Sequence, residues 1–170
     1  DAGESIAVPY PTYGLYDTLA SLQGARMIHV PYGDDWSLPE ELGTVGAKLV
    51  FVSSPNNPSA TLASREAILR LVERQNCIVV VDEAYTDFSG RSFIPDIAAH
   101  GNLIVIRTFS KSYALAGARL GLLFAQAPPL SYDDIVQRAR TSPEQFRTEA
   151  LLAERHRALA STRGFLREGP

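Results

Sequence analysis

Residues 77–88 read CIVVVDEAYTDF, an apolar run followed directly by acidic and aromatic residues. Four consecutive apolar residues, three of them valine, precede Asp82, and such a run is typical of a short strand that a parallel sheet buries on both faces. A carboxylate at the end of this strand is costly to bury unless it meets a compensating partner. We therefore expect Asp82 to cap a helix, to pair with an arginine, or to face a bound cationic group.

Similar short apolar runs occur on both sides of this stretch, separated by longer amphipathic segments. That alternation predicts an α/β fold, a three-layer and mainly parallel sheet with helices on its faces. The strands expected from the sequence are Arg26–Pro31, Lys48–Ser53, Cys77–Val81, Leu103–Arg107 and Leu120–Ala125. We expect the middle three of them to be covered on both faces.

Helix starts are marked by capping residues. Ser64 is placed to cap a helix over 63–75, and Ser37 with Glu40 has the spacing of a capping box before a short helical turn. Ser142-Pro143 introduces a long helix that extends to about Arg163. Each of these starts is an expectation about local structure only.

The prolines at 126–131 end the last expected strand and indicate a linker. We therefore expect a boundary there, between a first part over 1–125 and a linker with a C-terminal helical segment over 126–170.

The composition excludes several functional classes. The chain has 170 residues, 45% of them hydrophobic, and its net charge of -3 comes with 16 Lys and Arg that are scattered along the sequence. We expect no nucleic-acid partner and no membrane partner, because no basic cluster and no long apolar run occurs. The start of the sequence lacks a signal-peptide pattern, and the lone Cys77 fits a reducing compartment, so we expect a cytoplasmic protein.

Polar residues follow three of the expected strands, in the segments 53–60, 81–88 and 107–121. Because the carboxyl ends of parallel strands open on one crevice, we expect these segments to form one site for a small molecule. Lys111 alone is readily interpreted as a surface lysine. Thr108, Ser110 and Arg119 around it, however, suit a phosphate monoester, since hydroxyls and a guanidinium fork both donate to phosphate oxygens.

Three further residues each have two interpretations. Tyr85 is either a core residue or part of the site, and Asn57 either stabilises its Pro-Asn-Asn-Pro turn or faces a ligand. Tyr13 is either a packing aromatic at the start of a helix or a stacking platform for a ring.

In combination, SPNNPSA (54–60), VVVDEAYTDF (79–88), RTFSKSYALAGARLG (107–121) and PTYGLY (11–16) resemble a known family. It is the class I/II (fold-type I) aminotransferases, which depend on pyridoxal 5′-phosphate (PLP), and above all the histidinol-phosphate aminotransferases. The four motifs occur in the family's order along most of residues 1–125. Family members are considerably longer, and Ser59-Ala60 stand where they have Thr-Gly. The resemblance implies that 1–125 is a partial PLP-binding large domain and that 126–170 lead towards a missing or reduced small domain.

The resemblance implies three catalytic residues. Lys111 corresponds to the lysine that forms a Schiff base with PLP and transfers the substrate proton. Asp82 corresponds to the aspartate that faces the pyridine nitrogen, and Tyr85 to one of two residues that bond the phenolic oxygen.

The resemblance also implies the remaining cofactor contacts. Asn57 joins Tyr85 at the phenolic oxygen, and Tyr13 stacks on the pyridine ring. The phosphate is held by Thr108, Ser110 and Arg119.

The implied reaction is transamination between an amino acid or amine, with histidinol phosphate favoured, and 2-oxoglutarate. The implied assembly is a homodimer. An aromatic amino acid aminotransferase and a non-catalytic, truncated aminotransferase-like protein are the alternatives. Decarboxylation on the same scaffold fits RTFSKSYALAG less well.

Other classes lack their sequence signatures. No phosphate-binding glycine motif and no G-x-S-x-G motif occurs, which disfavours a nucleotide-binding domain and a serine hydrolase. No metal site is expected, because His29, His100 and His156 are widely dispersed.

Overall fold

The first of the two units into which the chain divides, Asp1–Gln126, contains a six-stranded sheet. A computed structural model describes residues 3–74 and 77–126 of the chain. The second unit, Ala127–Pro170, lies outside the described residues, and with it most of the expected linker and the helix expected at 142–163. The assignment of these parts to a large domain and a linker stays a prediction.

The strands lie in the order β2-β1-β3-β4-β5-β6. The first five are parallel, and β6 runs antiparallel to β5. Their bounds are Ser5–Tyr10 (β1), Arg26–Pro31 (β2), Leu49–Ser53 (β3), Ile78–Asp82 (β4), Leu103–Thr108 (β5) and Gly121–Ala125 (β6). The expected mainly parallel α/β fold is confirmed.

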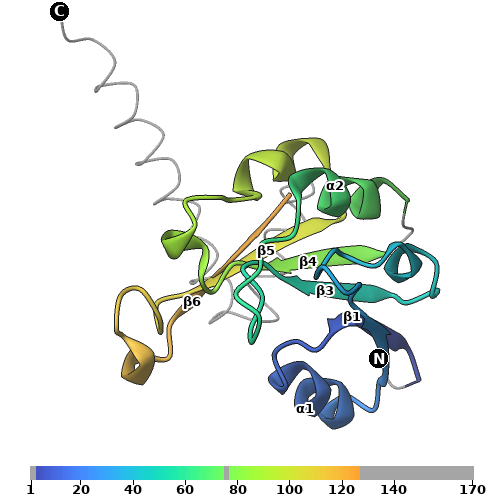
Figure 1. The fold of residues 1–170 in the computed structure, drawn as a ribbon. Helices are drawn as coiled ribbons and strands as arrows, with labels where there is room; N and C mark the ends of the chain where they lie inside the picture. The colour runs from blue at the N-terminus through green and yellow to red at the C-terminus, as the bar shows by residue number, and fades with distance from the viewer. Residues whose placement is uncertain (1–2, 75–76, 127–170) are drawn as a thin grey trace, which may run out of the picture. The chain divides into compact units, whose positions relative to one another are not determined.

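Helices cover both faces of this sheet. The α-helices are α1 (Leu15–Leu22) and α2 (Arg65–Arg74), and the 3₁₀ helices are η1 (Glu40–Gly43), η2 (Thr86–Phe88), η3 (Ile94–Ala99) and η4 (Ala116–Ala118). Helices α1 and α2 lie on opposite faces (Figure 1). The reason is that the chain steps from β1 to β2 in one direction and from β3 to β4 in the other, and right-handed crossovers then place the two helices on opposite sides. No helix within 3–74 and 77–126 is long and apolar enough to cross a membrane.

The main core lies between the sheet and α2. Val50, Val52, Val79 and Val81 are fully buried there, together with Ile68 of α2. Strand alternation sends their neighbours to the face that α1 covers. Val80 is buried on that second face. Phe51, Ile104 and Ile106 were expected to be buried there too, but they are only half-buried. Burial on both faces is therefore complete for the centre of β4 and partial for β3 and β5.

Strand β1 was not among the strands expected from the sequence. Its segment, SIAVPY, contains Pro9, and proline inside a strand argues against a central position because it donates no ladder hydrogen bond. The structure accommodates Pro9 because the pairing of β1 with β3 covers only Ile6 and Ala7. Pro9 thus lies beyond this ladder.

The two expected caps have different outcomes. Ser64 does cap α2, since its hydroxyl accepts the backbone N–H of Ala67 at 3.0 Å. The capping box of Ser37 with Glu40 is wrong, although the short helical turn η1 does form. Pro39 stands between them in an extended conformation and begins η1 with no side-chain cap, and the N–H of Ser37 instead donates to the Asp35 carboxylate at 2.9 Å.

Candidate active site

The carboxyl ends of the parallel strands meet at the point where the strand order reverses, between β1 and β3. Ligand crevices in open α/β sheets form at this kind of switch point. The parallel register places Ser53 beside Asp82 and Asp82 beside Ile106, so the segments that follow β3, β4 and β5 begin side by side. The segment that follows β1 joins them through Tyr13.

A cavity of about 300 Å³ occupies this position. All eight residues predicted from the sequence line it, so the expected convergence is observed, while their roles stay predictions. Its lining is Tyr13, Ser53, Asn57, Asp82, Ala84, Tyr85, Ile106, Arg107, Thr108, Ser110, Lys111, Ala116 and Arg119.

Asp82 is 9% exposed at the end of β4. Its Oδ2 accepts a hydrogen bond from the Tyr16 hydroxyl at 2.6 Å, and its Oδ1 accepts one from the N–H of Ala84 at 3.0 Å. Burial raises the pKa of this carboxyl and outweighs the two hydrogen bonds and the charge of Lys111, which lower it. Within residues 3–74 and 77–126, no ion pair joins Asp82 to a Lys or Arg.

Tyr16 was missed by sequence reasoning. It is 6% exposed on α1, three residues after Tyr13, and the two rings meet edge to face with centroids 5.6 Å apart. The only signal in the sequence was the i, i+3 spacing of two tyrosines within PTYGLY, which places them on one helix face. The bond to Asp82 spans 66 positions of the chain, and no local pattern reveals it.

Lys111 lies in the loop after β5 and is exposed. Its Nζ is 5.3 Å from the centroid of the Tyr85 ring, which is within cation–π range. The ammonium and the Asp82 carboxylate therefore face one cavity from two neighbouring strand ends.

The residues predicted to bind phosphate lie around this loop. The Thr108 hydroxyl donates to the Ser110 hydroxyl oxygen at 2.9 Å and accepts the Ser110 N–H at 3.1 Å. Arg119 has a φ of 50°, a left-handed conformation that is unusual for arginine, and its guanidinium donates to the Ala116 carbonyl at 3.2 Å. The side chains of Thr108, Ser110 and Arg119 thus line the cavity together with Lys111.

Two adjacent asparagines in the turn after β3, Asn56 and Asn57, have different surroundings. The side chain of Asn56 is buried and bonds the Thr12 hydroxyl, the Pro11 carbonyl and the Ser59 hydroxyl, so it fixes the turn to the segment after β1. Asn57 lines the cavity instead. Ala60 keeps the turn with a φ of 58°, the left-handed conformation that a glycine at this position would adopt without strain.

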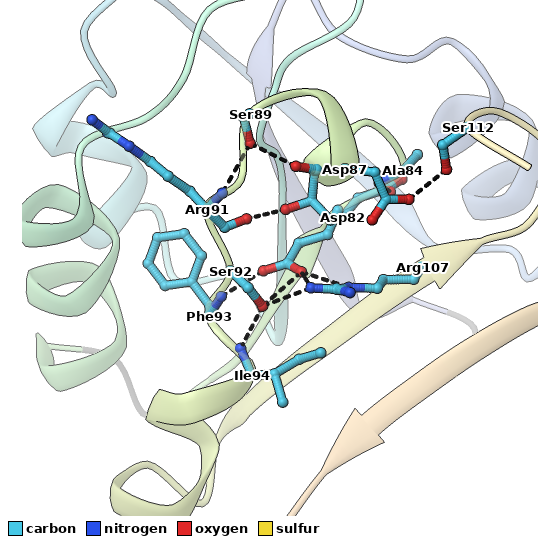
Figure 2. A network of polar contacts seen from close by, with 12 residues as sticks. Asp82, Ala84, Asp87, Ser89, Arg91, Ser92, Phe93, Ile94, Arg107 and Ser112 are labelled. Atoms are coloured by element: carbon cyan, nitrogen blue, oxygen red, sulfur yellow. Dashed lines mark hydrogen bonds and ion pairs between the residues drawn. The ribbon is translucent and has the colours of Figure 1, made fainter. Parts of the chain in front are cut away.

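A second carboxylate lies next to Asp82 but on the opposite face of β4. Glu83 is 2% exposed and accepts hydrogen bonds from Arg107 at 2.8 Å, Ser92 at 3.0 Å and the N–H of Phe93 at 2.5 Å. Figure 2 shows the Arg107 guanidinium and the Ser92 side chain pointing towards each other, and Arg107 also donates to Ser92 at 2.8 Å. The network ties the end of β4 to β5 beside the cavity and pairs Arg107 with Glu83.

The sequence matches the family model "Aminotransferase class I and II" over residues 1–162. The chain belongs to this aminotransferase family. It is 47% identical over 126 residues to the histidinol-phosphate aminotransferase of Rhodopirellula baltica, an alignment that covers 73% of this chain and 35% of the relative. It is 34% identical over 142 residues to that of Caldanaerobacter subterraneus, with coverage of 81% and 40%.

Comparison of the fold with solved structures gives the same family. A crystal structure of histidinol-phosphate aminotransferase from Sinorhizobium meliloti in complex with pyridoxal-5′-phosphate aligns with a TM-score of 0.64 and 29% identity. The alignment covers 74% of this chain and 36% of that one. The chain thus spans between a third and two-fifths of the length of these aminotransferases.

We predict that Glu83→Gln lowers the free energy of unfolding by about 3 kcal/mol, because it leaves the part-buried Arg107 guanidinium without its carboxylate. Urea denaturation of the two proteins measures the difference. Glu4→Gln, which breaks an exposed ion pair with Lys48, is the control and should change stability far less. Equal small effects of the two substitutions would show that the buried pair is not a major stabilising contact.

We predict that the stability of Asp82→Asn relative to the native protein, both without cofactor, increases as the pH rises from about 4. The folded-state pKa of Asp82 lies above its unfolded value, so its contribution to stability is present at low pH and is lost as the pH rises through the folded pKa. Urea denaturation between pH 4 and 8 gives the stability difference between the two proteins. Asp35→Asn is the control and should show no such rise between pH 4 and 8, because hydrogen bonds from Ser37 lower the pKa of Asp35 and its titration lies below this range. A difference for Asp82→Asn that is independent of pH would contradict the assignment.

Proposed function

We propose that this cavity binds PLP and that the chain is the cofactor-binding portion of an aminotransferase. The observation that carries the proposal is Asp82, a buried carboxylate without an ion-pair partner in the described part of the chain, which shares a cavity with the amine of Lys111. A buried carboxylate favours a cationic partner, and a protonated pyridine nitrogen is one. The solved relative with bound PLP supports the proposal.

The donor set of the cavity fits this cofactor. At about 300 Å³ the cavity is in the lower part of the usual range for small-molecule sites. Thr108, Ser110 and Arg119 offer neutral and cationic donors of the kind that hold a phosphate monoester. Asp82 and Lys111 supply the two ionisable groups that the ring requires.

When bound, PLP supplies an electron sink for negative charge at the substrate's α-carbon. In our proposal, Lys111 would hold the cofactor through its Nζ, and its amine would carry the proton that moves during transfer. The carboxylate of Asp82 accepts a hydrogen bond from the pyridine nitrogen and keeps it protonated. Both residues then act on the same ring from different strand ends.

Three other residues complete the proposed contacts. The amide of Asn57 and the phenol of Tyr85 donate to the phenolic oxygen of the cofactor. The ring of Tyr13, which is 42% exposed at the cavity, stacks on the pyridine face.

The amino donor proposed is histidinol phosphate, in line with the names of the two relatives. The acceptor proposed, 2-oxoglutarate, rests on the family resemblance alone. We propose a homodimer on the basis of the family resemblance alone. We also propose a cytoplasmic location, because the single cysteine of the sequence, Cys77, is buried and fits a reducing compartment.

We predict that PLP, added to the purified protein and reduced with borohydride, labels Lys111. The sequence has only two lysines, so peptide mapping by mass spectrometry gives a clear answer. Lys111→Ala should abolish the label on this peptide, and Lys48→Ala should leave it unchanged because Lys48 lies outside the cavity and pairs with Glu4. A label on Lys48 alone, or no label, would contradict the proposal.

The substrate is tested on the same preparation. Glutamate formed from 2-oxoglutarate is measured with histidinol phosphate and, separately, with phenylalanine as donor. Faster formation with histidinol phosphate supports the proposed substrate, and faster formation with phenylalanine favours an aromatic aminotransferase. Labelling of Lys111 without glutamate from either donor favours the non-catalytic alternative.

A further inference from the structure

Tyr16 makes three contacts that converge behind the cavity. Its hydroxyl donates to Asp82 Oδ2 at 2.6 Å, and its ring stacks on Phe51 of β3 with centroids 5.1 Å apart and an interplanar angle of 29°. The same ring meets Tyr13 edge to face at 5.6 Å and 88°. Tyr16 does not line the cavity itself.

These contacts link the two side chains proposed to act on the pyridine ring. Tyr13 is assigned to its face and Asp82 to its nitrogen, and Tyr16 touches both. The stacking on Phe51 holds the Tyr16 ring against the sheet, so the direction of its hydroxyl is fixed. A rigid donor on one carboxylate oxygen restricts how the carboxylate can rotate.

The hydroxyl stays protonated over the accessible pH range. Burial, followed by the nearby Asp82 carboxylate, raises the pKa of Tyr16 well above its usual range. The phenol is thus the donor and Asp82 the acceptor whenever the carboxyl is ionised. Besides Tyr16, the titratable side chains around Asp82 are those of Tyr13, Tyr85 and Lys111, which all face the cavity.

From this geometry we infer that Tyr16 is a positioning residue: it orients the Asp82 carboxylate towards the cofactor's ring nitrogen and holds Tyr13 against the ring face. The inference rests on the proposed function, because it needs PLP in this cavity. It adds a residue that touches neither cofactor nor substrate and acts only through its neighbours.

The test compares two cofactors in the same protein. Dissociation constants are measured by fluorescence titration for PLP and for its 1-deaza analogue, which has a carbon in place of the ring nitrogen. Tyr16→Phe keeps the ring contacts with Phe51 and Tyr13 and removes only the hydroxyl. We expect it to weaken PLP binding about tenfold, the usual effect of losing a hydrogen bond to a charged group, and to leave binding of the analogue nearly unchanged.

Two further variants separate positioning from general destabilisation. Tyr32→Phe removes the hydroxyl of a half-buried tyrosine whose ring meets Trp36 at a tilted angle outside the cavity, and it should bind both cofactors like the native protein. Tyr16→Leu also removes the ring contacts, so it should weaken the binding of both PLP and the analogue.

The outcomes distinguish the inference from the proposed function. Equal losses of PLP and analogue in Tyr16→Phe, or no loss of either, would overturn the role of Tyr16 while leaving the cofactor site intact. Failure of the native protein to bind PLP would overturn the proposed function, and the inference with it. A loss confined to PLP supports both.

Discussion

The parallel pairing of β3, β4 and β5 is the constraint on which the candidate site depends. It places Ser53, Asp82 and Ile106 in one row, so three loops that are distant in the sequence begin at the same edge of the sheet. The row is held by fully buried valines, which tolerate little displacement because protein interiors are close-packed. The cavity and its ionisable groups are therefore consequences of the sheet register.

The alternation of side chains along β4 gives two adjacent carboxylates opposite roles. Glu83 points to the face where Arg107, Ser92 and Phe93 satisfy it fully, and it fastens β4 to β5. Asp82 points to the cavity, where it accepts hydrogen bonds from Tyr16 and Ala84 and keeps a free side towards the solvent. A buried ion pair and a carboxylate that lines the cavity thus occupy neighbouring positions.

Local chemistry in the sequence was enough to predict most of this arrangement. Runs of β-branched residues predicted five of the six strands, and the rule that strand ends converge predicted which segments meet. β1 was not predicted, and Pro9 is unfavourable in a strand interior. Only the pairing of β1 with β3 shows why this proline is tolerated. The partners of Asp82 and Glu83 were not predicted because they are tertiary contacts. Nothing in the local sequence assigns Arg107 to Glu83 rather than to Asp82, or identifies Tyr16 as the donor to Asp82.

Our central proposal is that the buried carboxylate of Asp82 binds the protonated pyridine nitrogen of PLP. A crystal structure of the protein grown with PLP tests it most directly. The account predicts the pyridine nitrogen within about 3 Å of an Asp82 carboxylate oxygen, with the phosphate among Thr108, Ser110 and Arg119. Density for the cofactor in another place, or a ring turned so that its nitrogen faces away from Asp82, would contradict the account.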